Sequence, residues 1–590
     1  MQDRNINRYY VVLAIFALTA LMFACRLFYL QVVDEELKNS AENNSRRYVT
    51  QYPARGLILD RNGIPLVFNE AAYDLMVTPR LVKPFDTLDL CRILDITPEQ
   101  ARTNLRQARI YSRYKPSVFL KQISSQTYAI LQERLHKFPG FYVQPRTIRQ
   151  YQQRIAPHLL GYVGEVDEKL IRQDSYYKMG DYIGVSGIEK SYEEELRGKK
   201  GVKILLVDVH NAEKGSFKAG TFDTAAVVGR DLTCTLDSKL QAYGEHLMQN
   251  MRGSAVAIEP STGEILAMVS VPMYDPNLLV GRSRSSNYAK LQNDPDRPLI
   301  NRATNARYSP GSSFKTLQAL VLLQMGGITE DTRFSCNGPG SQPIKCTHHH
   351  GSPVSLLNAI EQSCNPYFWQ AFRSTLEMGG TPQFKTNYNE WRRQVMSFGI
   401  GTQLETDIPD ILEGNIPTDA YFNRYYGETG WRALTIRSLS IGQGEVLVTP
   451  LQLANLMAII ANRGYFYPPH MVRSGRNPEK HQTSVDPSHF PIVIEGMSRV
   501  NEFGTGRAWK LPNDIEWCGK TGTVQNAGKD HAIFVGFAPR ENPKIAIAVV
   551  VENAGFGATW AAPVASLMVE KYLTDSITRP WVEESLINFP

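Results

Sequence analysis

The stretch Ser309–Thr316 constrains this chain most, because it places Ser312 and Lys315 three positions apart where a helix is predicted to begin. Pro310 and Gly311 are typical of a helix entry, and an apolar run follows them. Residues three positions apart share one side of a helix, so we expect the Lys315 amine to reach the Ser312 hydroxyl. A lysine that burial or a second cation keeps neutral can accept the serine proton and make the oxygen a nucleophile. By itself, Ser-x-x-Lys also occurs at ordinary amphipathic helix starts.

Two later segments carry side chains that complete such a site. Ser363-Cys364-Asn365 comes first, and Lys520-Thr521-Gly522-Thr523 follows it much further along the chain. Ser-x-Asn alone is also typical of a helix cap. The order Ser-x-x-Lys, Ser-x-Asn, Lys-Thr-Gly is that of penicillin-binding proteins and serine β-lactamases, which this chain therefore resembles.

The resemblance implies a fold class: an α/β penicillin-recognising (serine β-lactamase-like) transpeptidase domain with an antiparallel sheet and flanking helices. The sequence agrees, since it contains two predicted hairpins rich in small and branched residues. These hairpins are Ser254–Glu259 with Glu264–Val271, and Ala532–Ala538 with Ile545–Glu552. We also expect a short strand over Thr233–Asp237, followed by a helix from Leu240 to Met251.

The N-terminus contains an uncharged run from Tyr9 to Cys25 that follows two arginines. It has the length of a short membrane span, and its positive flank favours a cytoplasmic N-terminus. A cleaved signal peptide or a lipid on Cys25 fits less well, because no small-x-small cleavage site is evident and apolar sequence continues. We expect a cytoplasmic tail over residues 1–8, a single transmembrane helix over 9–32, and the rest of the chain outside.

The composition narrows the remaining function classes. At 590 residues the chain is too long for one core. Its net charge of +6 is spread without a long basic block, so we expect no nucleic-acid binding. Seven cysteines are few and odd in number, which makes a disulfide scaffold improbable for an exported protein.

Three glycine-containing elements precede the Ser-x-x-Lys stretch, namely Arg55–Gly63, Gly161–Gly164 and Gly184–Glu189. They match the R-G-x-I-x-D-R-x-G, G-Y-V-G and G-x-x-G-x-E elements of class B penicillin-binding proteins, so the chain resembles that class. No glycosyltransferase-like segment separates them from the N-terminus, unlike in the bifunctional class A. The resemblance implies an elongated α+β non-catalytic pedestal (a dimerisation-like domain) over 33–230, a transpeptidase domain over 231–578 and a C-terminal tail over 579–590.

Within the expected pedestal, the pattern from Asp86 to Pro139 is helical. Thr97-Pro98-Glu99 predicts the start of one helix, and Gln122–Leu135 predicts a second.

The resemblance also implies catalytic roles. Ser312 attacks a D-alanyl-D-alanine carbonyl of a peptidoglycan stem peptide, and Lys315 accepts its proton. Ser363 passes a proton between Lys315 and the leaving amine, while Asn365 hydrogen-bonds the substrate amide. Lys520 lowers the pKa of Lys315 by its charge.

The resemblance also implies that the strand of Lys520 binds the substrate. Thr521 and Thr523 orient the substrate, and Gly522 lets it approach the backbone closely. The backbone N–H groups of Ser312 and Thr523 form the oxyanion hole.

A cysteine and histidine cluster lies beside the second motif: Cys336, Cys346, His348–His350 and Cys364. Three sulfurs and one ring nitrogen can complete a tetrahedral zinc site with no open position, which would be structural. The alternative is a Cys336–Cys346 disulfide with Cys364 buried, and the spacing leaves both open. The resemblance favours zinc, since zinc-binding members of the penicillin-binding protein 2 group place a His-Gly pair before a Ser-Cys-[Asp/Asn] segment. His350 fits best, with His348 or His349 as alternatives.

The cluster and Asp530–Pro539 resemble the elongation type of the class, although Asn365 stands where many members of that type have aspartate. The implied function is a D,D-transpeptidase of cell-wall elongation in the inner membrane, with its catalytic domain periplasmic. Implied partners are stem peptides, β-lactams, the membrane, a RodA-type glycan polymerase and other elongation-complex proteins. No organic cofactor is expected. The alternatives are a septal-type transpeptidase, a D,D-carboxypeptidase, and a non-catalytic penicillin sensor or scaffold.

Overall fold

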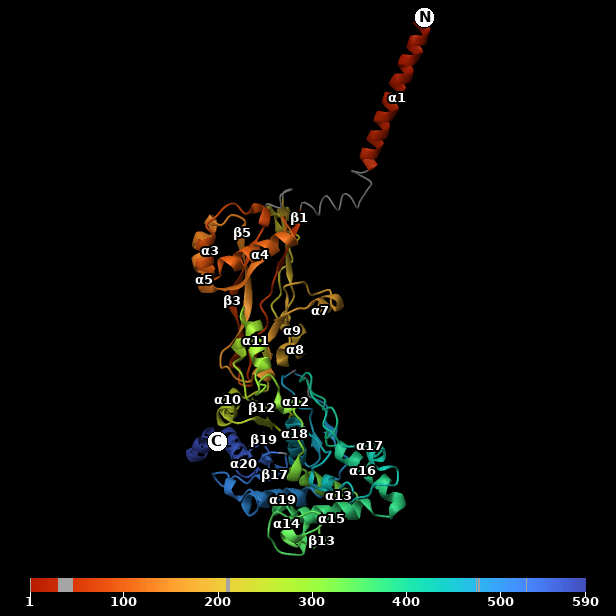
Figure 1. The fold of residues 1–590 in the computed structure, drawn as a ribbon, viewed down its shortest axis with the longest axis vertical. Helices are drawn as coiled ribbons and strands as arrows, with labels where there is room; N and C mark the ends of the chain where they lie inside the picture. Colours follow the sequence, from red (N-terminus) through yellow and green to blue (C-terminus); the bar gives the residue numbers. More distant parts are fainter. Residues whose placement is uncertain are drawn as a thin grey trace. The chain divides into compact units, whose positions relative to one another are not determined.

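The computed structural model describes residues 2–29, 46–207, 213–473, 475, 478–526 and 528–589 (Figure 1). The chain divides into two compact units. The first consists of 1–56, 69–148 and 197–230, and the second of 57–68, 149–196 and 231–590. Residues 30–45, where the predicted anchor ends and the predicted pedestal begins, lie outside the described residues. The domain boundaries expected from the sequence stay predictions.

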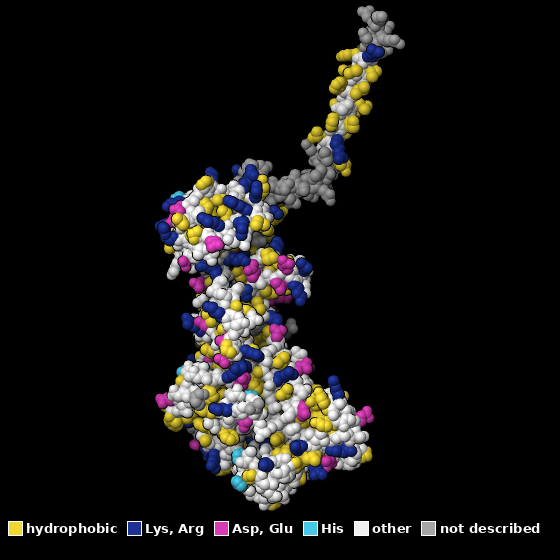
Figure 2. Space-filling view, in the orientation of Figure 1, with side chains coloured by type: hydrophobic (Ala, Val, Ile, Leu, Met, Phe, Trp, Pro, Cys, Tyr) yellow, Lys and Arg dark blue, Asp and Glu magenta, His cyan; other side chains and the backbone are white. Residues whose placement is uncertain are grey.

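Helix α1 (Gln2–Phe28) contains the predicted apolar run. Among the described residues it is the one helix long and apolar enough to cross a membrane, over Arg8–Phe28. Its hydrophobic side chains are exposed, as at Phe16 with 72%. Figure 2 shows them along the helix, with basic side chains at both ends. Such a surface suits hydrocarbon rather than water, so the predicted N-terminal apolar helix is confirmed.

The first unit contains a three-stranded antiparallel sheet and a helix-covered group of strands. The sheet has the order β1 (Arg46–Gln51), β8 (Gly201–Val207), β9 (Glu213–Ser216). In the second group β3 (Pro65–Val77) pairs with β4 (Ser117–Ser124) and β5 (Phe141–Tyr151). Helices α3 (Thr87–Leu94), α4 (Pro98–Tyr111) and α5 (Ser125–Arg134) share a buried core with these strands.

The helical prediction for this region is right for α4 and wrong at the start of α5. Thr97 caps α4 with a capping box, as the sequence indicated. Residues 122–124, however, end strand β4, whose Phe119 and Ile123 point into the core. The helix begins only after Ser124, because the Ser124 hydroxyl accepts the Thr127 N–H and caps it there.

The second unit is built on a five-stranded sheet in which every neighbouring pair is antiparallel. Its order is β12 (Ile265–Val271), β11 (Gly253–Ile258), β19 (Ile545–Val551), β18 (His531–Ala538), β17 (Cys518–Val524). Helix α18 (Pro450–Ala461) covers one face, and α10 (Ser238–Leu247) with α20 (Ala561–Thr574) covers the other (Figure 1). The two predicted hairpins and the antiparallel sheet with flanking helices are confirmed.

Covering both faces explains the sequence of β19, which is apolar at every position. Its Ala546, Ala548 and Val550 belong to the core shared with α18, whereas the residues between them belong to the core shared with α20.

The second unit contains further helices and short strands. The helices are α6 (Pro157–Leu160), α7 (Glu168–Gln173), α8 (Gly187–Ser191), α9 (Glu193–Arg197), α11 (Arg284–Asn293), α12 (Arg302–Asn305), α13 (Lys315–Gln324), α14 (Leu356–Glu361), α15 (Asn365–Leu376), α16 (Phe384–Met396), α17 (Asp419–Tyr426), α19 (Phe490–Glu502) and α21 (Pro580–Ile587). The short strands are β2 (Ile58–Leu59), β6 (Val163–Glu165), β7 (Tyr182–Gly184), β10 (Leu232–Thr233), β13 (Arg333–Phe334), β14 (Val354–Ser355), β15 (Tyr465–Phe466) and β16 (His481–Gln482). Of these strands, β2 and β10 pair in the sheet of β3 and β4.

The strand and helix expected after Thr233 are both present but shifted. Strand β10 ends at Thr233, and α10 begins at Ser238 and ends at Leu247, earlier than predicted. The cause is Asp237, whose carboxylate accepts the N–H groups of Lys239 and Leu240 and so fixes the helix start.

The turn of the Arg55–Gly63 element belongs to the second unit and is held there by two charged side chains. One carboxylate oxygen of the buried Asp60 accepts the N–H groups of Asn62 and Ile64, and the other accepts the Ser238 hydroxyl at 2.7 Å. Arg61 donates to Glu259 and Glu264, which lie at the two ends of the turn between β11 and β12. The element therefore has a structural role here.

We expect the Asp60→Ala variant of the full chain in detergent to unfold at lower denaturant, with a loss on the order of 3 kcal/mol. The substitution leaves two backbone N–H groups and the Ser238 hydroxyl without their acceptor. Asp60→Asn is the control, because an amide oxygen still accepts both N–H groups, so its loss should be clearly smaller. Equal unfolding of wild type and Asp60→Ala would contradict this account.

Candidate active site

Ser312 lies in the short 3-10 turn η6 (Gly311–Phe314), directly before α13. The backbone at Gly311 has φ +57°. It also packs closely against strand β17, because an added Cβ would lie only 2.8 Å from the Thr523 carbonyl oxygen. The Gly311 N–H donates to the Gly442 carbonyl at 2.8 Å. Glycine is required at such a position, and its packing fixes Ser312 beside the edge of the sheet.

Lys315 is fully buried, and its amine is held by the second motif. Nζ lies 2.8 Å from the Ser363 carbonyl oxygen, 3.1 Å from the Ser363 hydroxyl and 2.5 Å from Asn365 Oδ1. The amine is the donor in all three contacts. In its neutral form, its two N–H groups can serve the Ser363 carbonyl and the Asn365 amide oxygen, which leaves the lone pair free. Within the described part of the chain, the half-buried Ser312 hydroxyl makes no hydrogen bond, so the direct Lys315–Ser312 contact expected from helical spacing is absent.

The neutral form of Lys315 is also favoured electrostatically. Burial lowers its pKa to about 7, and the thiols of Cys364 and Cys346 oppose this only in part. The sequence analysis expected burial and a second cation, Lys520, to lower this pKa. Burial is the dominant cause, whereas the charge of Lys520 is not among the causes and that part needs correction. The pKa of Lys520 is itself lowered well below its usual value by burial and then by Lys315. Two buried amines disfavour each other's protonation.

The turn between α14 and α15 aims the second motif at this amine. Ser363 adopts φ +56°, a left-handed conformation that costs a non-glycine residue about 1–3 kcal/mol. Asn365 then begins α15 and presents its amide to Lys315. Strain of this kind persists only where surrounding contacts hold it, and here those contacts are the ones made to Lys315.

Strand β17 brings the third motif to the same place. It is the edge strand of the sheet, as predicted, and Lys520 is buried on it with its amine donating to the Thr521 carbonyl at 3.0 Å. A Cβ on Gly522 would lie 3.2 Å from the Pro310 carbonyl oxygen, so the strand backbone packs on the turn that carries Ser312. Thr523 borders Gly311 in the same way. The structure therefore brings together all three motifs.

A second cluster adjoins the motifs: Cys336, Cys346, His350 and Cys364 place their ligand atoms within 4.8 Å of one another. All seven cysteines are free, so the Cys336–Cys346 disulfide is not formed. His350 Nε2 lies 3.3 Å from Cys346 Sγ and 3.7 Å from Cys336 Sγ. Tetrahedral ligation of one ion by sulfur and nitrogen separates such atoms by about 3.6 Å, so these residues could hold a metal ion.

The ring of His350 is oriented for this task. Its Nδ1 lies 3.0 Å from the Gly351 carbonyl oxygen and donates to it, which leaves Nε2 facing the sulfurs. His349 instead lies against Gly338. The pKa of His348 is lowered mainly by burial of its ring. The charges of Lys520 and Lys315 lower it further.

Asn365 joins the two clusters. While Oδ1 contacts Lys315, Nδ2 donates to the Lys345 carbonyl at 3.0 Å, and Lys345 precedes Cys346 in the loop. The sequence analysis missed this contact because a backbone carbonyl leaves no trace in a sequence pattern. It also missed Thr505, whose hydroxyl lies 2.7 Å from that of Thr521.

Comparison with known proteins gives consistent matches over nearly the whole chain. The family model described as penicillin binding protein transpeptidase domain matches residues 253–570, and the one described as penicillin-binding protein dimerisation domain matches residues 50–234. The peptidoglycan D,D-transpeptidase MrdA of Acinetobacter baumannii is 32% identical over 97% of this chain and 88% of its own length. MrdA of Escherichia coli K12 is 31% identical, over 92% of this chain and 90% of its own.

Solved structures of three related proteins resemble this fold. Penicillin-binding protein 2 of Helicobacter pylori in complex with MreC has a TM-score of 0.75 at 26% identity, covering 89% of this chain and 99% of that one. Penicillin-binding protein 2 of Pseudomonas aeruginosa in complex with WCK 5153 has a TM-score of 0.65 at 28% identity, covering 90% and 97%. A chain of a peptidoglycan synthase complex that coordinates polymerization and crosslinking has a TM-score of 0.70 at 26% identity, covering 97% and 99%.

Proposed function

The chain belongs to the class B penicillin-binding proteins, in the penicillin-binding protein 2 group of peptidoglycan D,D-transpeptidases, and we propose that it cross-links stem peptides during cell-wall elongation through an acyl-enzyme on Ser312. The observation that carries the assignment to Ser312 is the buried amine of Lys315. It is held by Ser363 and Asn365 beside the turn that contains the serine.

Acylation begins when Ser312 Oγ attacks the carbonyl carbon of the penultimate D-alanine. The Ser312 proton passes to the lone pair of Lys315, and the C–N bond to the terminal D-alanine breaks. Ser363, whose hydroxyl lies 3.1 Å from the Lys315 amine, relays the proton to the leaving amine. Free D-alanine departs, and the shortened stem peptide remains as an ester on Ser312.

Transfer reverses these steps with another nucleophile. The amine of a neighbouring stem peptide attacks the ester carbonyl, the new amide bond forms, and the proton released by that amine returns to Ser312 through Lys315. The substrate lies along the edge of β17, where it is oriented by Lys520, Thr521, Gly522 and Thr523. Asn365 hydrogen-bonds its amide. The backbone N–H groups of Ser312 and Thr523 stabilise the oxyanion, at roughly a hundredfold in rate per donor.

We propose zinc as the ion of the Cys336, Cys346, His350 and Cys364 cluster, because three thiolates and an imidazole suit zinc, with no position left for water. Its chemistry would be structural. With the ion bound, the loop would hold Asn365 in two ways. The Lys345 carbonyl accepts its side-chain amide, and Cys364, the residue before it, would be a ligand.

The proposed location is the inner membrane, with α1 as a single-pass anchor and the catalytic unit on the periplasmic side. Arg4 and Arg8 before the apolar run support a cytoplasmic N-terminus. Proposed partners are the elongation-complex proteins, including a RodA-type glycan polymerase, and β-lactams are proposed inhibitors. The support is that related structures contain MreC or belong to a peptidoglycan synthase complex.

Ser312→Ala should abolish labelling by a fluorescent penicillin, lowering the acylation rate roughly a thousandfold or more, because no neighbouring oxygen replaces the nucleophile. Ser309→Ala, in the same stretch, is the control and should label like wild type. Wild type should also form cross-linked product from lipid-linked glycan strands. Equal labelling of Ser312→Ala would remove the assignment. Hydrolysis without cross-linking would indicate a carboxypeptidase, and labelling without any product a sensor or scaffold.

The penicillin acylation rate should rise with pH through about 7 and then level off. The pKa of Lys315 is lowered to about 7, so below that pH the amine is increasingly protonated and cannot accept the Ser312 proton. At pH values more than one unit below the pKa of Lys315, each further unit of pH should lower the acylation rate about tenfold. Stopped-flow acylation between pH 5.5 and 8.5 measures this profile. A flat profile, or one that falls as pH rises, would show that a neutral Lys315 is not the base.

Purified full-length protein should contain one zinc ion per chain, measured by elemental mass spectrometry. Cys336→Ser should lose most of it, since a ligand thiolate is removed, and should acylate more slowly because the loop no longer fixes Asn365. His349→Ala is the matched control, because this neighbouring ring lies outside the cluster, and it should keep the metal. Wild-type protein without stoichiometric zinc would refute the metal assignment.

A further inference from the structure

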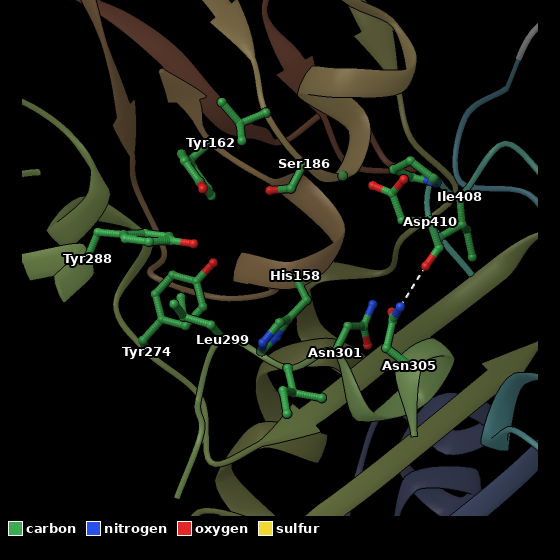
Figure 3. A pocket seen from close by; sticks show the side chains of 14 residues that line it. His158, Tyr162, Ser186, Tyr274, Tyr288, Leu299, Asn301, Asn305, Ile408 and Asp410 are labelled. Atoms are coloured by element: carbon green, nitrogen blue, oxygen red, sulfur yellow. Dashed lines mark hydrogen bonds between the residues drawn. The ribbon is translucent and has the colours of Figure 1, made fainter. Parts of the chain in front are cut away.

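A pocket of about 410 Å³ lies in the second unit, and none of its lining residues belongs to the three motifs or the cysteine cluster. Its walls come from the segment around α6 and α8, from α11 and α12, and from residues 408–410 (Figure 3). A volume of this size is within the range of small-ligand sites in proteins.

Three tyrosine hydroxyls converge in this pocket. Figure 3 shows Tyr162, Tyr274 and Tyr288 pointing their hydroxyls toward one another from different segments. The ring centroids of Tyr162 and Tyr288 lie 6.4 Å apart, and the Tyr274 residue is only 7% exposed. No hydrogen bond links any of the three hydroxyls to another described residue. All three hydroxyls therefore face the pocket and are available to donate to, or accept from, a ligand there.

The other polar groups in the pocket are equally available. His158 Nε2 donates to the Pro298 carbonyl at 2.7 Å, so its Nδ1 is left as an acceptor. Burial lowers the pKa of His158 to about 4, which keeps the ring neutral. Ser186 is the N-cap residue before α8 and makes no side-chain capping bond, so its hydroxyl is available to a ligand. Burial raises the pKa of Tyr162 and Tyr274, and both stay neutral donors and acceptors.

The charges around the pocket are already balanced. Asp410 is its one acidic lining residue, and its carboxylate contacts the Lys190 amine at 2.5 Å. The Asn305 amide donates to the Asp410 carbonyl, as the dashed line in Figure 3 marks. The pocket therefore offers neutral hydroxyl, imidazole and amide groups rather than an uncompensated charge. The matching ligand is uncharged at this point and rich in hydroxyl groups.

Aromatic and aliphatic surfaces complete the pocket. The tyrosine rings present apolar faces, and Val185, Leu299 and Ile408 add aliphatic surface. A hydrocarbon chain would leave the tyrosine hydroxyls unpaired, whereas a sugar ring has an apolar C–H face and hydroxyls around its edge. An N-acetyl group adds a methyl for the aliphatic surface and an amide for the polar groups.

We propose that this pocket binds one N-acetylated sugar unit of a glycan strand. The identity of the sugar rests on the proposed function, because peptidoglycan consists of stem peptides carried on strands of N-acetylated amino sugars. The pocket then gives the chain a second point of attachment to its substrate, one that recognises the strand rather than the peptide.

The test uses the full chain in a detergent without a sugar headgroup and a fluorescently end-labelled N-acetylglucosamine tetrasaccharide, with fluorescence anisotropy as the readout. Wild type should bind it. Tyr288→Phe, which removes one hydroxyl, should weaken binding about tenfold, and Tyr288→Ala, which also removes the ring face, should weaken it further. Tyr426→Ala is the control, because this 49% exposed tyrosine on α17 lies outside the pocket, and it should bind like wild type.

Three results would overturn the inference: no binding by wild type, unchanged binding by Tyr288→Ala, or equal binding of a glucose tetrasaccharide without N-acetyl groups. Fluorescent penicillin labelling of the same samples separates this test from the proposed function. Tyr288→Ala should still label on Ser312. Lost sugar binding with normal labelling supports the inference. Unchanged sugar binding with normal labelling refutes it and leaves the transpeptidase assignment intact, whereas wild type that never labels refutes that assignment alone.

Discussion

The candidate site of the second unit depends on the contacts that the buried amine of Lys315 makes. Three oxygens from a single turn surround it, and two of them come from Ser363, which holds a left-handed conformation to make those contacts. Burial lowers the pKa of Lys315 and so favours the neutral amine. Its position is fixed because α13 begins at Lys315 and α15 begins at Asn365. Around it, glycine contacts at Gly311 and Gly522 set the distance between the serine turn and strand β17.

Asn365 extends this arrangement outward. One end of its amide contacts the Lys315 amine, and the other contacts the loop that carries three residues of the cysteine and histidine cluster, which could hold a metal ion. Any change in that loop therefore reaches the amine through one side chain. The tyrosine pocket is different in kind, since its one acidic lining residue, Asp410, is paired with Lys190 and none of its lining residues belongs to a motif. In the proposed scheme the motifs act on the peptide and the pocket holds the strand.

Much of the site was predictable because its residues occur in short patterns of fixed order. Ser312, Lys315, Ser363 and Lys520 were found this way, and His350 was preferred through its glycine neighbour. Other features left no such pattern. The Lys345 carbonyl belongs to the backbone, and Tyr162, Tyr274 and Tyr288 come from unrelated segments that only the fold brings together. The start of α5 was misplaced because polar Gln122 and Ser124 suit a strand end and a helix cap as well as a helix. Burial was expected to lower the pKa of Lys315, but the contribution expected from Lys520 is not among the causes.

The most direct test of the central claim is a crystal structure of the full chain after reaction with a penicillin. The account predicts continuous electron density between Ser312 Oγ and the opened lactam carbonyl, with the Lys315 amine still in contact with Ser363 and Asn365. A penicillin bound covalently to another residue, or a Lys315 side chain turned away from both partners, would contradict it.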